Sequence, residues 1–149
     1  MNKFFKNLII IKIIMINLLY LPSALFSQDI QAISAIVNDE VISRYDVQQR
    51  VQLIVSTSGI KPTQENISRL EAQALRSLVN EKIQLQEAEK LDVPSSEQEV
   101  GLMLERIANG SQMSGEEILE LINSQGVRPD TLLNQIRAEL LWNKIVRGR

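Results

Sequence analysis

Neighbouring carboxylates are the residues of this 149-residue chain whose type and spacing could do chemistry. They form three pairs: Asp39 with Glu40, Glu87 with Glu89, and Glu116 with Glu117. Two carboxylates can act as general acid and base when they are buried together in one cleft. Each pair here instead falls in an expected turn or on the polar face of an expected helix, where such side chains are normally solvated. The pairs therefore predict a structural role rather than catalysis.

Histidine and cysteine, two residue types that enzymes often use as bases, nucleophiles and metal ligands, are missing. The chain has no His and no Cys, which excludes a Cys₂His₂ zinc site, a Ser-His-Asp triad and a Cys-His pair. Gly110 and Gly115 flank a turn without a Walker lysine or a GxGxxG pattern. Asp39 and Glu40 lack the further oxygen ligands of a calcium loop. The sequence predicts no catalytic residue, no cofactor and no metal.

The charge distribution argues against a nucleic-acid partner. Three of the 16 bases, Lys3, Lys6 and Lys12, lie in residues 1–27, which contain no acid. The rest of the chain therefore has 13 bases against 18 acids, a net charge of −5. Binding to phosphates needs a basic face. With 44% hydrophobic residues, the chain is expected to fold and to bind something other than nucleic acid.

Adaptable apolar side chains are the remaining candidates for binding. Four such side chains are candidates, because the apolar, core-facing positions of the expected helices do not require all of them: Met103, Met113, Leu119 and Trp142. Methionine and tryptophan suit adaptable binding surfaces. Ordinary core packing is the simpler interpretation for each residue taken singly. As a group, they predict a groove that binds a client peptide.

The stretch AIVNDEVISRYDV, residues 35–47, predicts a hairpin that leads directly into a helix. Residues 32–37 and 40–42 are the expected strands, with Asn38 and Asp39 as a two-residue turn. Ser43 stands three residues before Asp46, the spacing of a capping box. The helix is expected over residues 44–58, with Gly59 ending it. One irregular extended segment is the alternative to the hairpin.

Four more helices are expected, each after a turn. Their expected starts are Thr63, Ser96 with Glu99, Ser114 with Glu117, and Pro129 or Asp130. The first three are expected to end near Leu91, Gly110 and Gly126. The predicted fold class is mainly α, with a small N-terminal β-hairpin followed by about five helices.

Residues 1–27 have the composition of an export signal. A basic start is followed by an apolar stretch over residues 13–21 and by small residues before Ser27. We expect cleavage between Ser27 and Gln28, with Ala24 as the alternative site, and a domain over residues 28–149. An uncleaved membrane anchor is the other interpretation, since residues 8–26 approach the ~20 residues that span a bilayer.

Four segments carry a family resemblance through their order and spacing: AISAIVNDEVISRYDV, LRSLVNEKIQLQEAEKLDV, SSEQEVGLMLERIANGSQMSGEEILELINSQGV and TLLNQIRAELLWNKIVRGR. Asn38 and Asp46 match the start of the family pattern, and Gly126 with Arg137 and Glu139 matches its end. Over residues 32–149 the chain resembles the N-terminal domain of the SurA family, the periplasmic chaperones of outer-membrane protein assembly.

The resemblance implies a helical module that binds unfolded outer-membrane β-barrel polypeptides without ATP. In that family, one or two parvulin prolyl-isomerase domains normally follow, and then a C-terminal helix that packs back on this domain. A parvulin site is expected to use His with Cys or Asp, so the resemblance implies no isomerase activity in these residues. It also implies exposed apolar surface, which favours client binding or self-association.

Two other interpretations stay open. The chain could be the N-terminal fragment of a longer parvulin-type peptidyl-prolyl cis-trans isomerase, which a His-containing domain encoded after codon 149 would show. With an uncleaved leader, it would be a membrane-anchored assembly adaptor.

We expect the exported protein to begin at Gln28, because signal peptidase cuts after small residues that follow an apolar segment. Intact-mass measurement and N-terminal sequencing of periplasmic protein would check this. A start at Leu25 would keep the export prediction and move the cut. Full-length mass in the membrane fraction would contradict it and support the adaptor.

Overall fold

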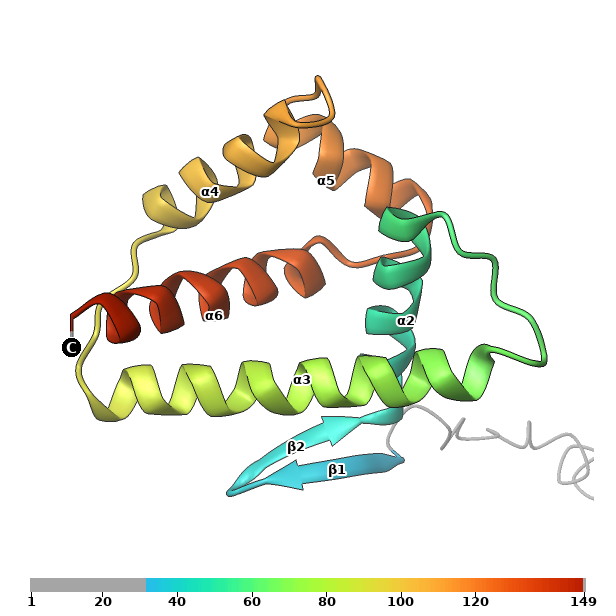
Figure 1. Cartoon of the computed structure of the whole chain (residues 1–149), viewed down its shortest axis with the longest axis horizontal. Coiled ribbons are helices and arrows are strands. Elements are labelled where there is room, and N and C mark those ends of the chain that lie inside the picture. The colour runs from blue at the N-terminus through green and yellow to red at the C-terminus, as the bar shows by residue number, and fades with distance from the viewer. Residues whose placement is uncertain (1–31, 149) are drawn as a thin grey trace, which may run out of the picture.

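The structure, a computed structural model, describes residues 32–148, so the expected signal and its cleavage site lie outside the described residues. The elements are, in order, β1 (Ile33–Val37), β2 (Glu40–Ser43), α2 (Arg44–Ser58), α3 (Ile67–Lys90), α4 (Glu97–Asn109), α5 (Gly115–Ser124) and α6 (Pro129–Arg147). This confirms the predicted hairpin and five helices. Figure 1 shows α6 running alongside the long α3, with the hairpin on the other side of α3. No helix within residues 32–148 is long and apolar enough to cross a membrane.

The hairpin is antiparallel and turns at Asn38, whose φ is 55°, a left-handed value that Asn tolerates. Its inner side chains, Val37 and Ile42, are buried against α2 and α3. Lys82 and Gln86 of α3 hold the turn by donating hydrogen bonds to the Glu40 carboxylate, at 2.5 and 2.8 Å. These two bonds hold the pKa of Glu40 below its usual value. One of the predicted carboxylates therefore joins the hairpin to the helix behind it.

Capping residues set the helix starts largely as predicted. Complete capping boxes begin three helices, with Ser43 and Asp46 at α2, Ser96 and Glu99 at α4, and Ser114 and Glu117 at α5. Positive φ values of 68° at Gly59 and 83° at Gly126 allow the chain to turn after α2 and α5.

The prediction that Thr63 caps α3 is wrong, because Asn66 precedes the first helical residue. The backbone N–H of Thr63 donates to the Asn66 side chain at 2.7 Å, and the Asn66 N–H donates to the Thr63 hydroxyl at 3.3 Å. The Thr63 side chain is thus used in a turn that comes before the helix.

The apolar core is divided into four small clusters. The largest joins the hairpin, α2 and α3. The others join α2 to α5 and the following loop, α3 to α6, and α4 to α6. Two of these clusters join helices that are far apart in the chain, and one polar contact joins three helices at once.

Arg50 of α2 makes that contact. Its side chain is buried, and it forms an ion pair with Glu81 of α3, which is also buried. The same guanidinium donates to the Ser77 hydroxyl at 2.9 Å and to the Gln135 side chain of α6 at 3.0 Å. It also donates to the backbone carbonyl of Thr131 at 3.3 Å. One side chain thus joins α2, α3 and α6.

We expect Glu81→Leu to lower the free energy of unfolding by about 3–5 kcal/mol, because it leaves the buried Arg50 charge without its anionic partner. The double variant Arg50→Leu/Glu81→Leu should lose less than the two single losses added together. Chemical denaturation followed by far-UV circular dichroism measures both. The exposed Arg128→Leu is the control and should leave stability nearly unchanged. A loss below about 1 kcal/mol for Glu81→Leu would contradict this account.

Candidate functional site

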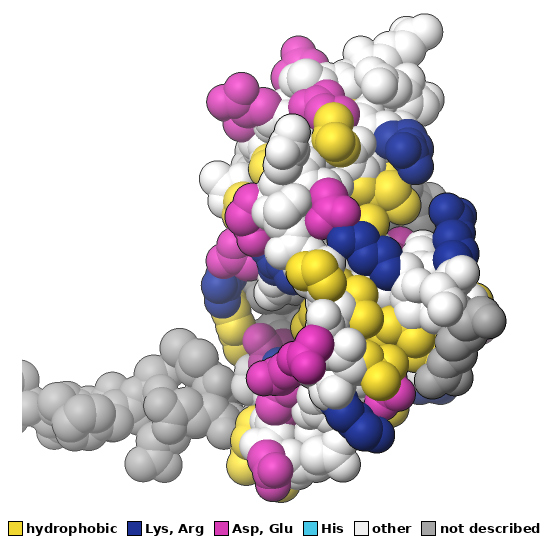
Figure 2. All heavy atoms as spheres, turned by 90° about the vertical axis from the view of Figure 1, so that its left-hand side faces the viewer, with side chains coloured by type: hydrophobic (Ala, Val, Ile, Leu, Met, Phe, Trp, Pro, Cys, Tyr) yellow, Lys and Arg dark blue, Asp and Glu magenta, His cyan; other side chains and the backbone are white. Residues whose placement is uncertain are grey.

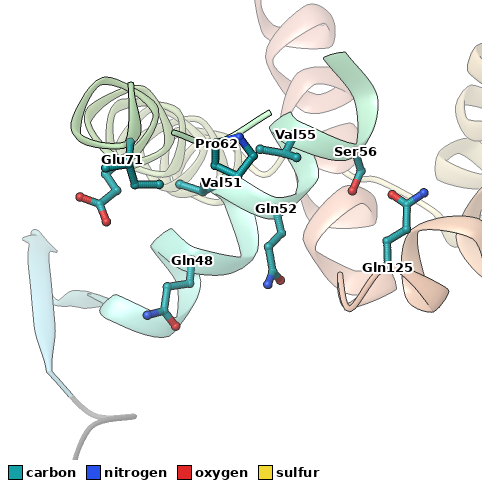
Figure 3. Close-up of a pocket in the computed structure, with 9 residues that line it drawn as sticks. Gln48, Val51, Gln52, Val55, Ser56, Pro62, Glu71 and Gln125 are labelled. Carbon is teal, nitrogen blue, oxygen red and sulfur yellow. The ribbon is translucent and has the colours of Figure 1, made fainter. Parts of the chain in front are cut away.

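A groove with a volume of about 650 Å³ lies between α2 and the start of α3 (Figure 3). Its lining residues come from α2, from the loop after α2, from α3 and from the end of α5: Gln48, Val51, Gln52, Val55, Ser56, Pro62, Ile67, Glu71 and Gln125. A volume of this size is typical of ligand-binding clefts.

The groove combines apolar and carboxamide side chains. Val51 is buried, and Val55 and Ile67 are half-buried, so that they form an aliphatic floor. Gln48, Gln52 and Gln125 are exposed. A spacing of four residues places Gln48, Gln52 and Ser56 on one face of α2. Carboxamides both donate and accept hydrogen bonds, so this rim can pair with a polypeptide backbone.

Local contacts hold the walls of the groove in place. Gln49 is buried and donates to the Gly126 carbonyl at 3.1 Å, and it accepts from the Arg128 N–H at 2.7 Å. These bonds fix the end of α5, and with it Gln125, against α2. On the other side, the Asn66 side chain donates to the Lys61 carbonyl at 3.1 Å, which stabilises the loop that contains Pro62.

A second hollow of about 600 Å³ adjoins the groove and shares Gln48 and Glu71 with it. It continues between α2 and α3 to the first strand, where Ile33 lines it. Arg44 also lines this second hollow. The two hollows together form one open surface, here called the α2/α3 groove, from the end of α5 to β1.

The four residues predicted to bind a client lie elsewhere. Met103 and Leu119 are half-buried and pack against the same cluster of α4 and α6. Leu119 also packs against the cluster between α2 and α5. Met113 is half-buried in the connection between α4 and α5, and Trp142 is 40% exposed on α6. The structure thus brings Met103 and Leu119 together, and a role of these four in client binding stays a prediction.

Trp142 belongs to an apolar surface at the end of the molecule where α3 and α6 both end. Leu91, Trp142 and Val146 are exposed there. Figure 2 looks at this end and shows hydrophobic side chains gathered between Lys and Arg side chains.

The α2/α3 groove was not predicted from the sequence. The available signal was the row of Gln48, Gln52 and Ser56 beside Val51 and Val55. A polar row on a helix is usually just its solvated face, so the row alone does not indicate a site.

Side chains that could bind a metal ion are scattered over residues 32–148. No group of three or more metal-binding side chains comes together in that part of the chain. Three of the paired carboxylates, Glu40, Glu87 and Glu117, have structural partners. Glu117 completes a capping box, and Glu87 pairs with Lys90 at 3.6 Å.

Comparison with known proteins agrees with this arrangement. Residues 30–146 match the SurA N-terminal domain family, and the chain belongs to it. The chain is 28% identical to a chaperone SurA of Pseudomonas fluorescens, over 91% of this chain and 32% of that protein. It is 31% identical to a chaperone SurA of Burkholderia pseudomallei, over 74% of this chain and 25% of that protein.

An uncharacterised protein of Rickettsia conorii is 28% identical, over 76% of this chain and 38% of that protein. The chain therefore spans about a quarter to two fifths of the length of these relatives. The family is that of the chaperone part of SurA and not of its parvulin catalytic domain.

We expect Leu119→Ala to cost about 1–3 kcal/mol of unfolding free energy, because its half-buried side chain contacts two core clusters. Trp142→Ala, at a more exposed position, should cost less. Urea denaturation followed by circular dichroism measures both. Equal losses of unfolding free energy in the two variants would contradict this expectation.

Proposed function

We propose that this domain is a periplasmic chaperone that binds unfolded outer-membrane β-barrel polypeptides and assists their folding and assembly. The observation that supports this most directly is the α2/α3 groove, with an aliphatic floor and a carboxamide rim, in a member of the SurA N-terminal domain family. An unfolded chain presents apolar side chains and unpaired backbone groups, and this groove offers partners for both.

The mechanism is shielding without chemistry. A client segment lies in the groove, its apolar side chains contact Val55 and Ile67, and its backbone exchanges hydrogen bonds with glutamine side chains. The client loses conformational entropy on binding, so each segment binds weakly and releases readily. Aggregation is suppressed while the segment is covered.

The periplasmic location is part of the proposal. It rests on the signal expected over residues 1–27 and on the similarity to chaperones named SurA. The mature domain would begin at Gln28.

The test is suppression of aggregation. A denatured outer-membrane β-barrel protein is diluted into buffer with and without the chaperone, expressed from its full coding sequence and purified after export, and light scattering is followed. We expect suppression at a near-stoichiometric ratio. Ser56→Phe should weaken it, because the half-buried Ser56 lines the groove and a phenyl ring would fill the space beside it.

Ser111→Phe is the matched control, since Ser111 is exposed in the turn between α4 and α5, away from the groove lining. Circular dichroism shows whether each variant is folded. A folded, monomeric wild-type chain without any suppression would overturn the proposed function. Equal suppression by wild type and Ser56→Phe would show that clients bind elsewhere, such as around Trp142.

A further inference from the structure

The two hollows of the α2/α3 groove meet at Gln48 and Glu71. Glu71 is exposed on α3, one turn after Ile67, and Figure 3 shows its carboxylate at the edge of the groove, pointing away from Val51 and Val55. Any extended chain that passes from one hollow into the other must cross this point. Glu71 is therefore placed to select among segments that share the same apolar content.

Within the described part of the chain, the Glu71 carboxylate is available to pair with a cation of a ligand. Within residues 32–148, the carboxylate forms no ion pair within 4 Å. It is the sole charged residue in the lining of the first hollow. Arg44, the other charged residue of the surface, lines only the second hollow, which Glu71 also lines. A cation entering the first hollow meets Glu71 and no competing base in its lining.

The remaining lining favours a peptide over a small cation. The Gln49 side chain donates to the Gln52 side-chain oxygen at 3.1 Å, which orients the Gln52 carboxamide at the rim. With Gln48 and Gln125, this rim is suited to backbone amides on both sides of the charge. Val55 and Ile67 are suited to an apolar residue next to it.

We propose that the α2/α3 groove selects extended segments in which a Lys or Arg side chain stands among apolar residues, with the cation on Glu71. This inference rests on the proposed function and adds the client chemistry to it. Charge complementarity supports this proposal: a carboxylate with no ion pair in residues 32–148, at the edge of an apolar, amide-rimmed surface, fits an apolar segment with one positive charge. The net charge of −5 over residues 28–149 adds long-range attraction for such segments.

The size of the effect follows from exposure. Ion pairs in contact with solvent are weak, and salt screens them. We therefore expect Glu71 to produce a preference of about two- to fivefold between otherwise identical segments. It should not decide whether apolar segments bind at all.

The probes are fluorescent, unstructured peptides with the central sequence Leu-Phe-Lys-Phe-Leu, and counterparts with Gln or Glu in place of Lys. Fluorescence anisotropy gives their dissociation constants for the exported protein. Wild type should bind the Lys peptide about two- to fivefold more tightly than the Gln peptide, and high salt should remove the difference. Glu71→Gln should bind both equally, and Glu71→Lys should favour the Glu peptide.

Glu89→Gln is the matched control, because Glu89 is exposed at the far end of the same helix and its loss changes the net charge equally. This variant should keep the wild-type preference. A Lys preference that is absent in wild type, or that persists in Glu71→Gln, would overturn the inference.

The outcomes separate this inference from the proposed function. If Ser56→Phe abolishes binding of all peptides but Glu71 has no effect, the proposed function stands and the assignment of Glu71 is wrong. If the folded wild-type protein binds no peptide and suppresses no aggregation, the proposed function and the assignment of Glu71 are both wrong. If it binds no peptide but dimerises in a manner that depends on Glu71, the occupant of the groove is a second copy, and the inference is overturned.

Discussion

The buried ion pair between Arg50 and Glu81 is the interaction on which the packing of the helices depends. Arginine stays charged in proteins, so Arg50, a residue that is 1% exposed, must find acceptors for its guanidinium inside the structure, and both terminal nitrogens find them while the buried Nε does not. Here α3 supplies Glu81 and Ser77, and α6 supplies Gln135 and a backbone carbonyl. A packing that moved α3 away would leave a buried charge unpaired, which costs several kcal/mol, and one that moved α6 away would leave buried N–H donors without acceptors. The apolar clusters join the same helices in pairs, α2 with α3 and α3 with α6, whereas Arg50 contacts α3 and α6 together.

The same constraint accounts for the α2/α3 groove. Adjacent residues of a helix point in different directions. Arg50 and Gln49 are committed to contacts with α3, α6 and the loop after α5. Gln48 and Gln52 lie along the open side of α2, where the Gln49 side chain also donates to the Gln52 side chain. The contacts of Gln49 with the backbone around Gly126 then bring Gln125 to the end of the groove. The buried polar contacts of Arg50 and the lining of the groove thus come from different faces of α2.

A surface of this kind suits a protein that must hold many different chains. A deep apolar pocket would demand one side chain of a particular shape, whereas an open groove with aliphatic floor and flexible glutamines accepts many. The relatives named SurA are chaperones, and the chemistry of the groove is consistent with that family. The apolar end surface around Trp142 is a separate feature, at the opposite end of α3 from Ile67.

The local elements of this protein follow from its sequence. Serine followed three residues later by an acid satisfies backbone N–H groups at a helix start, and this bonding needs only neighbouring residues, so the starts of α2, α4 and α5 were predictable. The left-handed turns at Gly59 and Gly126 and the turn at Asn38 are local for the same reason. Thr63 shows the limit, because it exchanges local hydrogen bonds with Asn66 while the helix α3 begins only at Ile67.

What only the tertiary structure decided is which polar residues go inside and which apolar residues stay out. In the sequence, Arg50 and Glu81 resemble solvated charges, and a groove of glutamines resembles an ordinary polar face. Met103 and Leu119 stood out as candidates for binding, yet they pack against the core. The physical reason is that burial depends on the rotation of each helix about its axis relative to its neighbours. That rotation is set by contacts between residues far apart in the chain, such as Arg50 with Gln135, which no pattern within one helix contains.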